Sequence, residues 1–265
     1  MLFPKAERVL YGKNPLVEVV CQFRFPTILR IREGQLADFQ DIVRKDYPVY
    51  SAHEPSFGVP SQIPKEFAAI IDQMNIPTPP ELIVHRFSTK DSQRFISLRE
   101  EFMALAETKY ERWESFKGEI IKTESALRKV YEPAFYSRVG LRYRDIISRR
   151  KLELNGIEWQ ELLQKHIIAE LGDEKVADAI RRIQTRVIME ISGMPNGQVT
   201  LNHGLIIPNG GDEECYLIDA DFSVERKEGV DEPFKILDEF NRMAGGLFRW
   251  AIRERLHKAM QPRVI

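Results

Sequence analysis

The stretch Phe135 to Ile147 reads FYSRVGLRYRDII, and its alternating pattern sets the interpretation of the rest of the chain. Because successive side chains of a strand point to opposite faces, Val139, Leu141 and Tyr143 are expected on one face. Asp145 shares that apolar face. The opposite face is expected to carry Tyr136, Arg138, Gly140, Arg142 and Arg144. The pattern predicts a sheet with one face covered by helices and one polar, open face.

The order of the expected elements around this strand occurs twice in the chain. In the first half we predict a strand at 16–25, a helix at 34–45, strands at 82–87, 94–98 and 102–107, and a helix at 113–130. In the second half we predict a strand at 135–147, a helix at 158–171, strands at 185–191, 198–207 and 215–224, and a helix at 233–256. Each half reads β-α-β-β-β-α. The chain is therefore predicted to be α+β, with an antiparallel sheet and helices on one face, divided into residues 1–131 and 132–265.

Sequence similarity between the halves gives limited support for an internal duplication. At a separation of 118 residues, Arg24 corresponds to Arg142, and the window 107–117 has five identities with 225–235. Chance agreement among common residue types is the alternative. The segment 48–80, with seven prolines, has no counterpart in the second half. It is expected to cover a sheet end or to contact a partner.

Composition restricts the class of protein. The chain has 265 residues, 43% hydrophobic and 30% charged, with a formal net charge of −1, which argues mildly against a dedicated nucleic-acid binder. Cys21 and Cys215 are the only cysteines, too few for a disulfide framework or a zinc site of their own. No secretory signal or membrane-spanning run is recognised, so a cytoplasmic location with reduced thiols is expected.

Charge is distributed unevenly along the chain. Residues 128–151 contain eight bases and two acids, whereas residues 212–232 contain nine acids and two bases. Such opposed blocks either pair within the fold or mark two different surfaces.

Motifs for catalysis are not found. The sequence has no glycine-rich phosphate loop, no histidine pair at metal spacing, no CxxC and no Gly-x-Ser-x-Gly, so no cofactor is predicted. One alternative is a divalent-metal enzyme in which Asp219 and Asp221, two apart on a strand, act with Glu190. Gly245 and Gly246 inside the last helix predict close helix-to-sheet packing or a kink there.

The arginine-bearing face admits two interpretations. It is either a solvated surface whose arginines pair with acids such as Glu190 and Glu107, or a binding face suited to phosphate or carboxylate. In the binding interpretation, Arg24 adds a further guanidinium, Tyr136 a stacking surface and Gly140 room for close approach. The leading hypothesis is a non-enzymatic protein that binds a protein partner or an anionic ligand through Arg24, Tyr136, Arg138, Arg142 and Arg144. Nucleic-acid binding is a further alternative, and the oligomeric state is left open.

The two stretches NPLVEVVCQFRF, at 14–25, and FYSRVGLRYRDII resemble a sporadically distributed bacterial family of proteins of about this length, whose members are described only as uncharacterised. The resemblance spans nearly the whole chain and implies a bacterial accessory protein, but it supplies no catalytic residues. In shape, a duplicated β-α-β-β-β-α unit is similar to the saddle of the TATA-binding protein and to helix-grip ligand binders. That is an analogy of architecture, which does not fix function.

Overall fold

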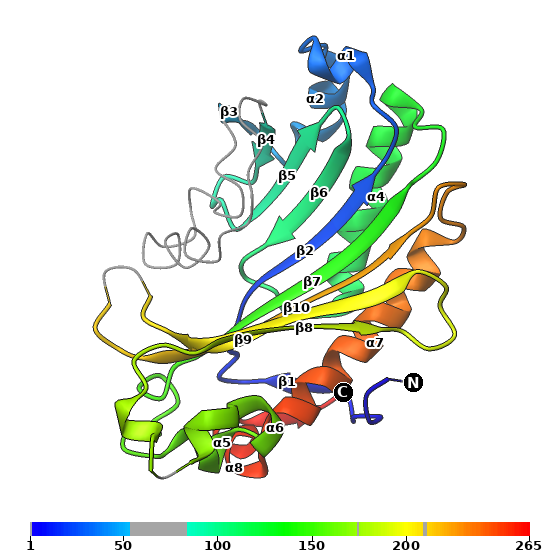
Figure 1. Cartoon of the computed structure of the whole chain (residues 1–265). Coiled ribbons are helices and arrows are strands. Elements are labelled where there is room, and N and C mark those ends of the chain that lie inside the picture. Colours follow the sequence, from blue (N-terminus) through cyan, green and yellow to red (C-terminus); the bar gives the residue numbers. More distant parts are fainter. Residues whose placement is uncertain (1, 54–83, 174, 209–210) are drawn as a thin grey trace.

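One continuous antiparallel sheet of nine strands forms the centre of the molecule (Figure 1). The computed structural model of the protein describes residues 2–53, 84–173, 175–208 and 211–265. The strand order is β3-β4-β5-β6-β2-β7-β10-β9-β8. The strands are β2 (Leu16–Arg24), β3 (Val49–His53), β4 (Val84–Ser88), β5 (Arg94–Arg99), β6 (Phe102–Glu107), β7 (Arg138–Ile147), β8 (Gln184–Glu190), β9 (Gly197–Ile206) and β10 (Cys215–Glu225).

Two long helices, α4 (Trp113–Tyr131) and α7 (Pro233–Ala251), lie against the same face of this sheet (Figure 1). The apolar residues of β2 and β7 that face the helices join one large core with both of them, including Phe23, Leu141, Ile120 and Phe240. Shorter helices are α1 (Leu29–Arg32), α2 (Ala37–Val43), α5 (Trp159–Leu162), α6 (Lys165–Ile168) and α8 (Glu254–Ala259). Among the described residues, no helix is long and apolar enough to cross a membrane.

The predicted α+β fold with an antiparallel sheet is confirmed. The two halves also share a strand order, β2-β6-β5-β4 in the first and β7-β10-β9-β8 in the second. They join where β2 pairs with β7, in the middle of the sheet. The helices α4 and α7 are each 19 residues long. The boundary between residues 131 and 132 stays a prediction.

Two predicted helices are interrupted at a common point. Leu163 and Ile252 form an isolated antiparallel bridge, and Arg253 N donates to Leu162 O at 2.8 Å. Both segments must be extended to make these bonds, so the helix expected at 158–171 is broken after α5. The helix expected at 233–256 ends as α7 and resumes as α8. The helix expected at 34–45 is also shorter, since only α2 forms there.

Three strands were not predicted. β1 (Val9–Tyr11) pairs with β11 (Pro262–Val264), so both ends of the chain form a two-stranded ribbon. β3 comes from the start of the proline-rich segment and pairs with β4 at the sheet edge. The remainder of that segment, from residue 54 on, lies outside the described residues.

Candidate functional site

The arginines of β7 face a row of acids on the neighbouring strand β10. In the register of the two strands, Arg142 lies opposite Asp221 and Arg144 opposite Asp219. The ion pairs run diagonally: Arg142 Nε donates to Asp219 at 2.6 Å, and Arg138 Nη2 donates to Asp221 at 2.9 Å. The basic and acidic blocks of the sequence therefore pair with each other within the sheet.

Arg144 is the most deeply buried of the three arginines. Its Nη1 lies 3.0 Å from Glu18 Oε2 on β2, and the side chains of Arg144 and Glu18 are 6% and 4% exposed. β2 belongs to the first half of the chain and β7 to the second. This pair therefore joins the halves and leaves Arg144 unable to present its guanidinium to a partner.

Two opposing effects set the pKa values of the acids on this face: burial raises them, and the ion pairs with arginine lower them. Burial alone would raise the pKa of Asp219, but the Arg142 guanidinium holds it below its ordinary value. Burial raises the pKa of Asp221 despite the attraction of Arg138. Asp219 is therefore ionised as the counter-ion of Arg142 at neutral pH.

Several details expected of the arginine face are wrong. Tyr136 precedes β7, is buried on the helix side against Phe23, and donates its hydroxyl to Glu124 of α4 at 2.6 Å. The side chain of Arg138 fills the space beside Gly140, because a Cβ on residue 140 would lie 2.4 Å from Arg138 Nη1.

The expected partners of the arginines also differ from the observed ones. Glu107 pairs with Arg94 of β5 at 2.6 Å. Glu190 lies on the edge strand β8, opposite Gln198. The acids that pair with the β7 arginines are Glu18, Asp219, Asp221 and Glu225.

At one end of the open face, two of the predicted residues line a common pocket of about 610 Å³. Arg24, the last residue of β2, lies directly opposite Arg138 in the register of β2 and β7. Arg138 bonds to Gln22 and Asp221, whereas Arg24 is exposed and makes no side-chain hydrogen bond or ion pair with any described residue. Arg226 and Lys227, from the turn after β10, line the same pocket.

The metal alternative is not supported by the geometry. Asp219 and Asp221 share a face, but each is bonded to an arginine, and β9 separates their strand from that of Glu190. Within the described ranges, no group of three His, Cys, Asp or Glu residues could hold a metal ion.

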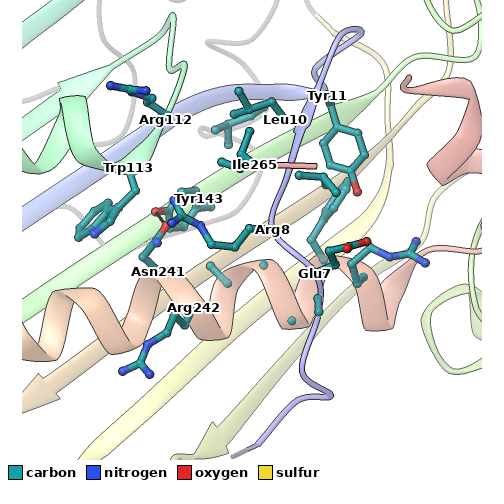
Figure 2. A pocket seen from close by; sticks show the side chains of 18 of the residues that line it. Glu7, Arg8, Leu10, Tyr11, Arg112, Trp113, Tyr143, Asn241, Arg242 and Ile265 are labelled. Atoms are coloured by element: carbon teal, nitrogen blue, oxygen red, sulfur yellow. Dashed lines mark hydrogen bonds between the residues drawn. The ribbon is translucent and has the colours of Figure 1, made fainter. Parts of the chain in front are cut away.

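A second pocket, on the helix side of the sheet, was not predicted. It has a volume of about 490 Å³ and lies between the N-terminal segment, the start of α4, α7 and the floor strand β7 (Figure 2). Tyr143 of the floor donates its hydroxyl to Asn241 of α7 at 2.9 Å. The signals in the sequence were Asp145, an acid on the apolar face of its strand, and the glycine pair Gly245 and Gly246 inside the last helix.

Comparison with known proteins gives no match: no family model matches the chain, and no curated protein matches its sequence. The assignment of function therefore depends on the two pockets and their chemistry.

Proposed function

We propose that this chain is a non-enzymatic binding protein that recognises an anionic group at the Arg24–Arg138 pocket. One observation carries the proposal: two arginines lie directly opposite each other on neighbouring strands, and Arg24 makes no ion pair with any described residue. Asp221 and Glu225 compensate the charge of Arg138, so the guanidinium of Arg24 is the group without a counter-ion among the described residues. A bound carboxylate or phosphate would supply that counter-charge and accept hydrogen bonds from Arg24.

The pocket supports recognition of an anion in the presence of nearby acids. Glu225 approaches Arg138 Nε at 3.3 Å, so Arg138 is largely neutralised. Arg24, Arg226 and Lys227 are the remaining bases of the pocket wall and Glu101 and Glu228 its remaining acids, so the wall has one more base than acids. The other arginines of the predicted face, Arg142 and Arg144, stabilise the sheet through their ion pairs and are not part of the proposed site.

In this proposal the anionic group can belong to a protein partner, because the pocket is open and lies at the end of the sheet. A bacterial, cytoplasmic accessory role belongs to the same proposal. Its support is the resemblance of two strand motifs and the two buried, unpaired thiols of Cys21 and Cys215.

The test is a titration of the purified protein with inorganic phosphate and with citrate, followed by the melting temperature and by calorimetry. Arg24→Ala should weaken anion binding by about tenfold or more, because a hydrogen bond to a charged group contributes roughly 1.5–3 kcal/mol. Arg44→Ala at the C-cap of α2 is the matched control, because it removes an exposed arginine whose one ion-pair partner among the described residues is Asp41. Equal anion binding by wild type and Arg24→Ala would contradict the proposal, as would tight binding of a divalent metal at Asp219.

A further inference from the structure

Asp145 is a buried carboxyl group that opens into the helix-side pocket. Its exposed fraction is 9%, and no hydrogen bond or ion pair links its side chain to any described residue. Buried carboxyl groups normally have a partner, because an unpaired one is costly in either protonation state. Asp145 therefore lacks a partner among the described residues and also lines the cavity.

Aromatic side chains make up much of the wall around this carboxyl group. Tyr11 of β1 packs edge-on against Phe248 of α7, with ring centroids 5.8 Å apart. Tyr110 packs edge-on against Tyr143 at 6.0 Å. Trp113, at the start of α4, also lines the pocket, and Figure 2 shows it beside Tyr143 and Asn241. Aromatic faces attract cations, most strongly where water is excluded.

The mouth of the pocket carries both positive and negative side chains, so it gives little preference between cationic and anionic ligands. Lys5, Arg112 and Arg242 are opposed by Glu7 and Glu111. Arg8 is neutralised by Glu114, whose Oε1 lies 2.7 Å from Arg8 Nη2. Preference between ligands is therefore decided at the floor, where Asp145 lies.

Arg249 also lines the pocket but is not the counter-ion of Asp145. Its Nη2 donates to Glu254 at 3.3 Å, and no ion pair joins it to Asp145. An anionic ligand held by Arg249 is the rival occupant, and the test below distinguishes it from a cation.

We propose that this pocket binds an organic cation, namely a protonated amine on an apolar body, with its ammonium group at Asp145 and its body among Tyr11, Tyr110, Trp113, Tyr143 and Phe248. The cavity of about 490 Å³ has the size of small-molecule sites in proteins. The proposal is independent of the anion pocket, which lies on the opposite face of the sheet.

The ribbon of the two chain ends gives this site a roof. β1 runs over α7 and carries Tyr11, whose hydroxyl lies 2.9 Å from His257 Nδ1 of α8. Gly246 of α7 lets the N-terminal segment approach, because a Cβ there would lie 2.8 Å from Pro4 O. Gly245 also lines the pocket, and a Cβ added to it would meet nothing within 4 Å. A larger side chain at residue 245 would therefore project into open space of the pocket.

The test uses the full chain and three probes that share one apolar body: phenylbutylamine, phenylbutanol and phenylbutyrate. Binding is measured by calorimetry at about pH 9, where the Asp145 carboxyl is ionised and the amine is still protonated. Phenylbutylamine should bind about tenfold or more tightly than the other two. Asp145→Asn should reduce its affinity to that of phenylbutanol while leaving phenylbutanol binding unchanged. Arg24→Ala should leave phenylbutylamine binding unchanged, so this result and that of the anion pocket are separable.

Two glycine variants test the location. Gly245→Leu should abolish phenylbutylamine binding by occupying the cavity. Gly118→Leu is the matched control, since residue 118 lies in the other long helix, where an added Cβ also meets nothing within 4 Å. The proposal is overturned if phenylbutyrate or phenylbutanol binds as tightly as the amine, or if no amine binding appears at millimolar concentration. Retained affinity in Asp145→Asn or Gly245→Leu overturns it as well.

Discussion

At the scale of single residues, Asp145 is a buried group whose protonation affects the stability of the unliganded protein. Burial, together with the nearby charge of Asp219 on β10, raises the pKa of Asp145 to about 8. Burial raises the pKa of Tyr11 and Tyr110, so neither ionises below pH 8. Burial and Arg249 lower the pKa of His257, which is bonded to Tyr11.

The pH dependence of stability follows from this raised pKa. Between its ordinary pKa near 4 and about 8, Asp145 holds its proton in the folded state and loses it in the unfolded state. The contribution of Asp145 to the free energy of unfolding is therefore fully present below pH 4 and is lost as the pH rises to 8. Asp145→Asn should equal wild type near pH 4 and exceed its free energy of unfolding by about 5 kcal/mol at pH 8.

Urea denaturation of both proteins at several pH values measures this difference. His257 is unchanged in the variant, so its titration cancels in the comparison. A constant difference between pH 4 and pH 8 would contradict the predicted protonation of Asp145.

At the scale of elements, β7 holds its neighbours through buried ion pairs as well as through backbone hydrogen bonds. Arg144→Ala should lower the free energy of unfolding by about 3–5 kcal/mol, because it removes the ion-pair partner of the buried Glu18 carboxylate. Replacing both residues, as Arg144→Met with Glu18→Leu, should cost less than Arg144→Ala alone, since neither charge is then stranded.

Arg150→Ala provides the matched control for Arg144→Ala. Arg150 pairs with Asp212 at 3.0 Å, but both side chains are exposed, so its loss should change stability by about 0.5 kcal/mol or less. Thermal and urea unfolding of the wild type and these three variants test the pair. A small effect of Arg144→Ala would mean that Glu18 finds water or another donor.

The elements also show what the sequence could and could not predict. Alternation correctly assigned Leu141 to the core and Arg142 to the opposite face, because both lie inside β7. That face was expected to be open, but Glu18, Arg144 and Asp219 are buried on it. The assignment was wrong for Tyr136, which precedes the strand, since alternation holds only where the backbone is extended and paired. The partners of Arg142 and Arg144 could not be predicted, because local sequence does not say which strands become neighbours.

The two pockets illustrate the same limit at longer range. Arg24 was predicted as a binding residue from its strand position, but its pocket needs Arg226 from a turn about 200 residues away. The helix-side pocket combines Tyr11, Trp113, Asp145 and Phe248, and no local pattern relates such distant positions. The acid on an apolar face and the Gly245–Gly246 pair were visible in the sequence.

At the scale of the whole molecule, the two halves are joined too closely to behave as separate domains. The sheet is continuous across β2 and β7, and Phe23 of β2 packs against Tyr136 and Phe234 of the second half. The long helices are also linked, since Lys117 Nζ of α4 donates to Asp238 Oδ2 of α7 at 2.7 Å.

This arrangement predicts a single cooperative unfolding transition for the full chain, although the two halves share a strand order. Separate expression of residues 1–131 or 132–265 would expose the β2 or β7 edge and one side of the shared core, so neither fragment should be a folded monomer. Coincident near- and far-ultraviolet circular dichroism transitions, with matching calorimetric and van't Hoff enthalpies, are the expected result. Two separate transitions, or a folded monomeric fragment, would show instead that the halves are independent domains and that the β2–β7 junction contributes little to stability.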